Sequence, residues 1–238
     1  MNSPSVPLDH MGYQNSNQPP RRQPNSALRS REYLTTDEVN SLRIAAKSIG
    51  RNRLRDATLI LLGYRHGLRV SELIDLRWDQ VDLKRELLHI RRLKNGTSSN
   101  HPIGKKERRG LQRLRERYPN MTFVFVSERK RPLAASTVRK IIARAGKRAR
   151  IPFPVHPHML RHACGYKLAN DGHDTRAIQH YLGHRNINHT VRYTELSPHR
   201  FRGFLEGSMP GRQSPRQQAS RLNVKFHSLF RTLAEDPV

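Results

Sequence analysis

The sequence predicts a mainly helical fold with one small antiparallel β-sheet, an α+β arrangement. Apolar residues recur at helical spacing through most of the chain. One stretch, residues 86–103, instead shows two apolar segments around Asn95-Gly96, a dipeptide typical of β-hairpins. The length of 238 residues suits one compact domain with tails.

The first predicted helix begins after Thr35. Thr35 and Glu38 have capping-box spacing, in which each side chain binds the other's backbone N–H group. A more buried helix is expected over residues 53–64, and Gly67 should end it. A short helix over residues 70–76 follows.

The middle of the chain contains the predicted sheet. Residues 86–93 form its first strand, and the second strand ends near Ile103. Residues 105–118 have the pattern of a surface helix, and residues 123–126 that of a short apolar strand.

Three further helices are expected after the sheet. Ser136 is expected to cap one that reaches residue 149. The others span residues 158–170 and residues 175–182, the second ending at Gly183.

The two ends of the chain differ in composition from the middle. Residues 1–32 are rich in Asn, Pro, Ser, Gln and Arg, which predicts a disordered basic arm before a folded domain over residues 33–206. Residues 207–238 read as a linker and an amphipathic helix that can pack on its own domain or on a neighbour. Its apolar face comprises Leu222, Phe226, Leu229, Phe230 and Leu233.

The charge of the chain indicates a polyanionic partner. There are 45 Lys and Arg against 19 Asp and Glu, a formal charge of +26. Such an excess favours nucleic acid, because each neutralised phosphate releases a counterion, although a solvated basic surface has the same composition. One predicted helix concentrates these charges, and we expect its cations to contact DNA phosphates: Arg139, Lys140, Arg144, Lys147 and Arg148.

The single cysteine, Cys164, excludes an intrachain disulfide and fits a reducing compartment. No segment has the pattern of a signal peptide or of a membrane span. We therefore expect a cytoplasmic protein at the bacterial nucleoid, with no membrane partner.

The segment from residue 156 to Tyr193 is the most informative for chemistry. It contains His158, Arg161, His184 and the tyrosine: a proton carrier, a fixed positive fork, a hydrogen-bond donor and a hydroxyl nucleophile. Together with the charge of the chain, this set fits attack of a tyrosine on a DNA phosphodiester.

Other readings of the polar residues are weaker. His158 and His162 have the i, i+4 spacing of zinc ligands, but no further ligands close a site, so we expect no metal. Ser71, Ser136 and Cys164 have no adjacent base pattern, and we assign them to caps or core.

Several motifs resemble those of the tyrosine recombinase (phage integrase) family. They are residues 158–162 (HMLRH), residues 182–184 (LGH) and Tyr193 nine positions later. Upstream, residues 67–73 (GLRVSEL) are similar to the family's first arginine motif, and Lys94 enters the hairpin where the family places its catalytic lysine. The wording of these motifs resembles the small recombinases that invert fimbrial promoter switches.

The resemblance implies a catalytic-domain fold over about residues 33–205 and a set of roles. The tyrosine attacks the scissile phosphate, forms a 3′-phosphotyrosyl link and releases a 5′-hydroxyl. Two arginines clamp the non-bridging oxygens, the lysine protonates the leaving oxygen, the first histidine assists proton transfer at the tyrosine, and the second donates to the phosphate. In the order of the chain these residues are Arg69, Lys94, His158, Arg161, His184 and Tyr193. Glu72 is expected to orient the first arginine.

The resemblance also implies double-stranded DNA as partner, no cofactor, and a homotetramer on two DNA sites, with a monomer or dimer off DNA. Accessory DNA-bending proteins are a further expectation, because the 34 or so residues before the first helix are too few for the family's N-terminal DNA-binding domain. The terminal helix is a candidate for docking on a neighbouring protomer.

Two other functions stay open from sequence. A type IB topoisomerase-like nicking and closing enzyme would use the same chemistry without pairing two sites. A DNA-binding regulator with a decayed site is the non-enzymatic alternative, although all six positions hold competent residues. Whether the product is inversion, excision or integration is not encoded in these motifs.

Overall fold

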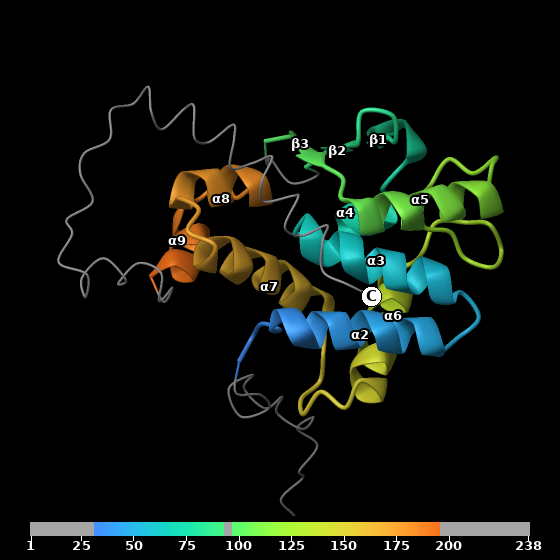
Figure 1. Cartoon of the computed structure of the whole chain (residues 1–238), viewed down its shortest axis with the longest axis horizontal. Helices are drawn as coiled ribbons and strands as arrows, with labels where there is room; N and C mark the ends of the chain where they lie inside the picture. The colour runs from blue at the N-terminus through green and yellow to red at the C-terminus, as the bar shows by residue number, and fades with distance from the viewer. Residues whose placement is uncertain (1–30, 93–96, 196–238) are drawn as a thin grey trace, which may run out of the picture.

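The computed structural model describes residues 31–92 and 97–195, and it has the predicted mainly helical architecture with one small antiparallel sheet. Figure 1 shows the sheet at one end of the helical body, and α8 and α9 together at the far end of α7. The helices are α2 (Thr36–Ser48), α3 (Arg53–Arg65), α4 (Val70–Ile74), α5 (Lys105–Arg117), α6 (Ala135–Arg148), α7 (Pro157–Asn170), α8 (Thr175–Leu182) and α9 (Asn188–Thr194).

The sheet has three strands in the order β1 (Val81–Asp82), β2 (Leu87–Ile90) and β3 (Ser99–Pro102). β2 and β3 pair antiparallel, with Leu88 opposite His101, as the hairpin pattern predicts. The predicted turn dipeptide lies outside the described residues. β1 was not predicted, because two residues are too few to show a strand pattern.

The capping box at the start of α2 is confirmed. The Thr35 hydroxyl accepts from the Glu38 N–H group at 3.2 Å, and the Glu38 carboxylate accepts from the Thr35 N–H group at 2.9 Å. Arg31 also pairs with Glu38, at 2.7 Å, and so lies against the start of α2.

α3 is the most buried helix. Its residues from Arg55 to Tyr64 are all buried, and they include the apolar run from Leu59 to Leu62. Gly63 gives α3 close contact with Leu73 and Leu160, the side chains nearest to a Cβ placed at that position. α3 therefore supports both α4 and α7.

Two local predictions were wrong, and one helix was not predicted. Residues 123–126 form no strand; the segment makes only isolated bridges, one of them between Arg77 and Phe123, although Phe125 is buried. Ser136 does not cap α6; the N-cap is Ala134, two residues earlier, and the helix starts at Ala135. Residues 188–194 form α9, for which the sequence shows no cap or periodic signal; Ile187 precedes it without a side-chain hydrogen bond.

The predicted arm and the predicted terminal helix fall almost wholly outside the described residues. Within the described residues no helix is long and apolar enough to cross a membrane.

Candidate active site

The first two turns of α7 carry three of the polar residues of interest: His158, Arg161 and His162. Pro157 starts the helix, where its missing N–H group costs nothing. Met159 and Leu160 are fully buried and anchor the same turns in the core. The functional side chains therefore stand on a rigid element.

Arg161 is almost completely buried, with 4% of its surface exposed. Its guanidinium donates to the carbonyl oxygens of Gly67 and, at 2.7 Å, of Leu182. These carbonyls lie just before Arg69 and His184, so one arginine fixes both neighbouring segments. Burial, and then the nearby charge of Arg69, lower the pKa of Arg161 to about 10, which leaves it charged at neutral pH.

Arg69 precedes α4 and is oriented by Glu72, as predicted. The Glu72 carboxylate accepts from the Arg69 guanidinium at 2.9 Å and from the Arg69 backbone N–H group at 2.8 Å. The Arg69 side chain stays 26% exposed while that of Glu72 is 2% exposed. The side chain of Arg69 is thus held by Glu72 and remains partly accessible.

The sequence motifs give no role to Arg92, which the structure places at the site. Its side chain is fully buried, donates to Glu72 at 2.8 Å and donates to the Tyr181 carbonyl. Gly183 permits this position: its φ is +66°, and a Cβ there would lie 2.5 Å from the Arg92 Nε atom. Arg91, the residue just before Arg92, is exposed, so the pattern of charges along the sequence does not reveal that Arg92 is buried.

Tyr193 lies on α9 with 1% of its surface exposed. Its ring packs against Gly165, where a Cβ would lie 2.6 Å from a ring carbon, and against Tyr166, with ring centroids 5.0 Å apart. Its hydroxyl is 2.9 Å from the Nδ1 atom of His162. Burial raises the pKa of Tyr193 to about 12, so the phenol needs an acceptor for its proton before it can attack.

His184 follows the left-handed Gly183 that ends α8. Its Nδ1 atom is 2.8 Å from the Thr190 hydroxyl, and its ring stacks on that of Tyr193 with centroids 6.2 Å apart. Burial, and then Arg161 and Arg69, lower the pKa of His184 to about 3. The ring is therefore neutral at pH 7 and can donate one hydrogen bond through Nε2 while Nδ1 accepts from Thr190.

His158 is exposed to solvent, and it lies near Arg161 and Arg69. Desolvation lowers its pKa, followed by the charges of Arg161, Arg69 and Arg139. Its ring centroid is 6.5 Å from that of His162, one turn further along α7. Of these two histidines, His162 is the one that touches the Tyr193 hydroxyl.

The structure thus brings five of the six predicted site residues to one region, while Lys94 lies outside the described residues. No three His, Cys, Asp or Glu side chains in the described ranges form a group that could hold a metal ion. Cys164 is buried, its thiol 3.6 Å from the Arg65 carbonyl oxygen, and burial raises its pKa to about 12. It is a core residue, as predicted.

The predicted DNA-contacting cations are all exposed on α6, opposite a buried stripe that includes Ile141, Ile142 and Ala145. Arg139 lies toward the site, because its charge lowers the pKa of His158. Arg144 lies toward Asp56 instead, whose carboxylate it stabilises. The cationic face of α6 therefore extends away from the site. The five residues are Arg139, Lys140, Arg144, Lys147 and Arg148.

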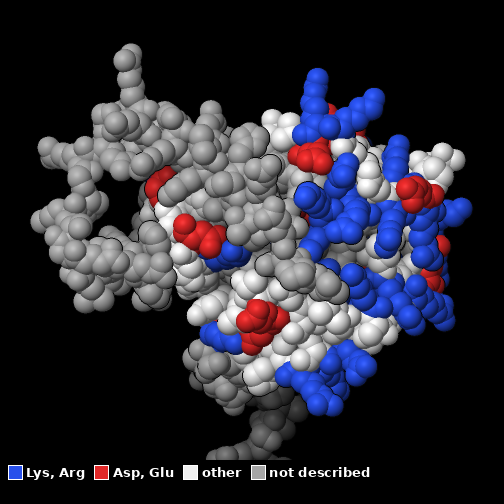
Figure 2. All heavy atoms as spheres, in the orientation of Figure 1, with Lys and Arg blue, Asp and Glu red and all other residues white. Residues whose placement is uncertain are grey.

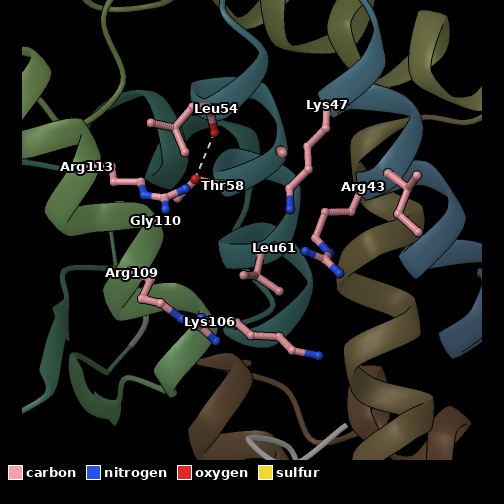
Figure 3. Close-up of a pocket in the computed structure, with 11 residues that line it drawn as sticks. Arg43, Lys47, Leu54, Thr58, Leu61, Lys106, Arg109, Gly110 and Arg113 are labelled. Carbon is pink, nitrogen blue, oxygen red and sulfur yellow. Dashed lines mark hydrogen bonds between the residues drawn. The ribbon is translucent and has the colours of Figure 1, made fainter. Parts of the chain in front are cut away.

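A second cationic surface lies in a groove between α2 and α5, and α3 forms the floor of this groove. Lys and Arg side chains gather on the side of the molecule where α5 lies (Figure 2), and Figure 3 shows them around a pocket of about 500 Å³. Leu54 and Thr58 on α3 form part of the floor of this pocket. Gly63, which contacts α4 and α7, follows Leu54 by two and a half helical turns and therefore lies on the opposite side of α3. This α2–α5 groove is therefore separate from the site. Its cations are Arg43, Lys47, Lys106, Arg109 and Arg113.

The sequence of the whole domain matches known proteins. Residues 32–200 match the model of the phage integrase family. The chain is 46% identical over 185 residues to the type 1 fimbriae regulatory protein FimE of Escherichia coli (strain K12), covering 75% of this chain and 93% of that protein. It is 43% identical over 190 residues to FimB of the same strain, covering 78% and 94%.

Solved structures have the same fold. The crystal structure of XerA recombinase aligns with a TM-score of 0.64 and 29% identity, covering 75% of this chain and 64% of that chain. A lambda integrase tetramer bound to a Holliday junction aligns with a TM-score of 0.53 at 24% identity, covering 64% of this chain and 47% of that chain, which shows the fold alone. By its family match and its relatives, the chain belongs to the phage integrase family, the tyrosine recombinases.

Proposed function

We propose that the chain is a site-specific DNA recombinase in which Tyr193 attacks the scissile phosphate. The observation that carries the proposal is the meeting of Tyr193 and His184 with two arginines of different exposure, Arg161 and Arg69. A hydroxyl nucleophile beside fixed cations is what transesterification of a phosphodiester requires.

In the proposed reaction, the Tyr193 oxygen bonds to phosphorus and the bond from phosphorus to the 5′-oxygen breaks. The product is a 3′-phosphotyrosyl link, which conserves the phosphoester bond for rejoining, so that no nucleotide or metal is consumed. Lys94 supplies the proton for the leaving 5′-oxygen. A free 5′-hydroxyl later attacks the link and restores the tyrosine.

The two arginines divide the work of holding the phosphate. Arg161 is immobilised by two carbonyl oxygens and supplies a fixed positive charge. The side chain of Arg69 is partly accessible, and its guanidinium can fork onto the non-bridging oxygens. Neutral His184 adds a hydrogen bond. Groups already oriented toward the developing charge stabilise the transition state by several kcal/mol.

The duplex is proposed to extend from this site along the exposed face of α6. Arg139 is the connecting residue, since it lies near His158 while its helix neighbours continue the cationic face. Phosphate contacts by these side chains would position the DNA without reading its sequence.

The proposed assembly is a homotetramer on two DNA sites, and the proposed outcome is inversion of a DNA segment. The tetrameric lambda integrase shares the fold, and two relatives carry names that refer to regulation of type 1 fimbriae. The predicted terminal helix, with Leu222 and Leu233 on its apolar face, is the segment proposed to join neighbouring protomers.

Covalent trapping tests the function. The protein is incubated in EDTA with nicked duplexes tiled from DNA flanking its own gene, and the products are separated on a denaturing gel. We expect a protein–DNA adduct with the wild type and none with Tyr193→Phe, which should still bind DNA. Tight binding without an adduct on any duplex would favour a DNA-binding regulator.

A further inference from the structure

We propose that the α2–α5 groove binds a partner protein through an amphipathic helix that has an apolar stripe between acidic flanks. The groove lies on the side of α3 opposite to the α4 and α7 contacts, so this interaction is separate from the proposed cleavage reaction. Its lining contains five cations, several apolar side chains and no Asp or Glu. The cations are Arg43, Lys47, Lys106, Arg109 and Arg113.

The floor of the groove has the spacing that a bound helix needs. Four of its side chains lie at positions i, i+3, i+4 and i+7 of α3, which makes a row about 10 Å long. They are Leu54, Ala57, Thr58 and Leu61. The Thr58 hydroxyl already donates to the Leu54 carbonyl oxygen at 2.8 Å, so the row is mainly apolar. An amphipathic helix laid along it would bury apolar side chains that have the same repeat.

One apolar side chain on α2 extends this row into solvent. Ile44 lines the groove with 58% of its surface exposed, and in residues 31–92 and 97–195 no other large hydrophobic side chain is as open to solvent. Because burial of apolar surface favours association, a partner that covers Ile44 gains affinity. The groove therefore calls for an apolar stripe on the partner.

The cations on the two walls crowd one another, and none has an acidic partner in the described part of the chain. Burial, and then the charges of Arg43, Arg113, Lys106 and Arg109, lower the pKa of Lys47. The Nε atom of Arg43 is buried without a hydrogen-bond partner. Figure 3 shows the side chains of both walls reaching over α3. Carboxylates on the two flanks of a bound helix would relieve this repulsion.

These features favour a separate acidic protein over two other occupants. The proposed duplex path follows the site and α6, and a DNA backbone has no apolar stripe to place on the floor of the groove. Residues 221–238 have an apolar face, but they carry three Lys and Arg against two Asp and Glu. Their charge does not complement five cations.

Binding of a designed peptide tests the proposal. The probe is a fluorescein-labelled helical peptide with Leu at i, i+3, i+4 and i+7 and Glu on both flanks. The control peptide has the same composition, with its leucines spread around the helix. In anisotropy titrations with the full chain, the probe should bind about tenfold more tightly or better, because only the probe presents a continuous stripe to the floor.

Matched variants locate the binding. The groove variant combines Lys47→Gln, Arg109→Gln and Arg113→Gln, all at exposed positions, and it should weaken probe binding about tenfold or more. The matched α6 variant also removes three exposed cations and should weaken binding less than about threefold, because salt screens distant charges. It combines Lys140→Gln, Lys147→Gln and Arg148→Gln.

A single substitution separates apolar burial from charge. Ile44→Ser leaves every cation in place, so it should weaken binding of the probe and leave binding of the control peptide unchanged. Thermal unfolding of this variant should match the wild type, since Ile44 is exposed.

Each other result would overturn the proposal. Equal binding of the two peptides, or equal losses in the groove and α6 variants, would show a general effect of the positive charge of the chain. A larger loss of affinity for duplex DNA than for the probe in the groove variant would assign the groove to DNA. Tighter binding of a peptide of residues 221–238 than of the probe would assign the groove to a segment of the chain itself.

Discussion

The guanidinium of Arg92 donates to the carboxylate of Glu72 across 2.8 Å, and the same carboxylate holds Arg69. One buried anion is therefore shared between a fully buried cation and the accessible arginine proposed to bind phosphate. The orientation of Arg69 depends on a residue that no sequence motif marks.

Arg92→Gln is expected to destabilise the protein by about 3 kcal/mol, because it leaves the buried Glu72 carboxylate with one cation where it had two. It should also slow cleavage, since Glu72 can then shift away from Arg69. Urea denaturation and single-turnover cleavage measure the two effects. Arg91→Gln, on an exposed neighbour, should change stability by no more than about 0.5 kcal/mol. Equal effects of the two variants would show that the buried pair is unimportant.

Gly183→Ala should destabilise the protein more than Gly50→Ala. Both glycines have positive φ, so alanine carries a backbone cost of about 1 kcal/mol at either position. Only at Gly183 would the new methyl group collide with Arg92; at Gly50 the nearest atom is 3.9 Å away. Thermal unfolding of both variants checks the difference, and a smaller loss at Gly183 would contradict the close approach.

Neutralising cations on α6 should weaken the salt dependence of DNA binding. Changing Arg139, Lys140 and Lys147 to Gln should reduce the slope of log affinity against log salt by about 0.9 for each lost phosphate contact, or about 3 in total. The matched control changes Lys106, Arg109 and Arg113, which line the separate α2–α5 groove. If this control lowers the slope as much, the duplex contacts that groove and the proposed path along α6 is wrong.

Stability is expected to fall as the solution is acidified from pH 6.5. The pKa of His162 is lowered to about 4, that of His184 to about 3, and that of the buried His101 also lies well below its usual value. Below pH 6.5 the unfolded chain binds protons that the folded chain excludes, so folding free energy is lost as pH falls toward these values. At pH 4 the loss is at most about 3 kcal/mol per imidazole. Denaturation at pH 7 and pH 4.5 measures it, and His162→Asn should show a smaller difference.

The sequence predicts most of the framework because its signals are local. The capping box at Thr35, the apolar run of α3 and the left-handed stop at Gly183 each act within a few residues. α9 escaped prediction because it is short, uncapped and held by tertiary contacts of Tyr193.

The sequence indicated which residues would lie together, but not the contacts between them. Motif order identified Arg69, Arg161 and Tyr193, which the structure brings to one region. Arg92 and His162 make contacts with residues 20 and 31 positions away, and spacing along the chain cannot reveal such contacts.

The burial of Tyr193 has a consequence for the safety of the genome. A chain with this positive charge binds DNA of any sequence, so an exposed nucleophilic tyrosine would cleave DNA at random positions. Because the phenol of Tyr193 is buried against α7, random contacts with DNA do not lead to cleavage. Cleavage therefore requires a target whose docking uncovers the Tyr193 hydroxyl, and the burial of this residue adds to the fidelity of the enzyme.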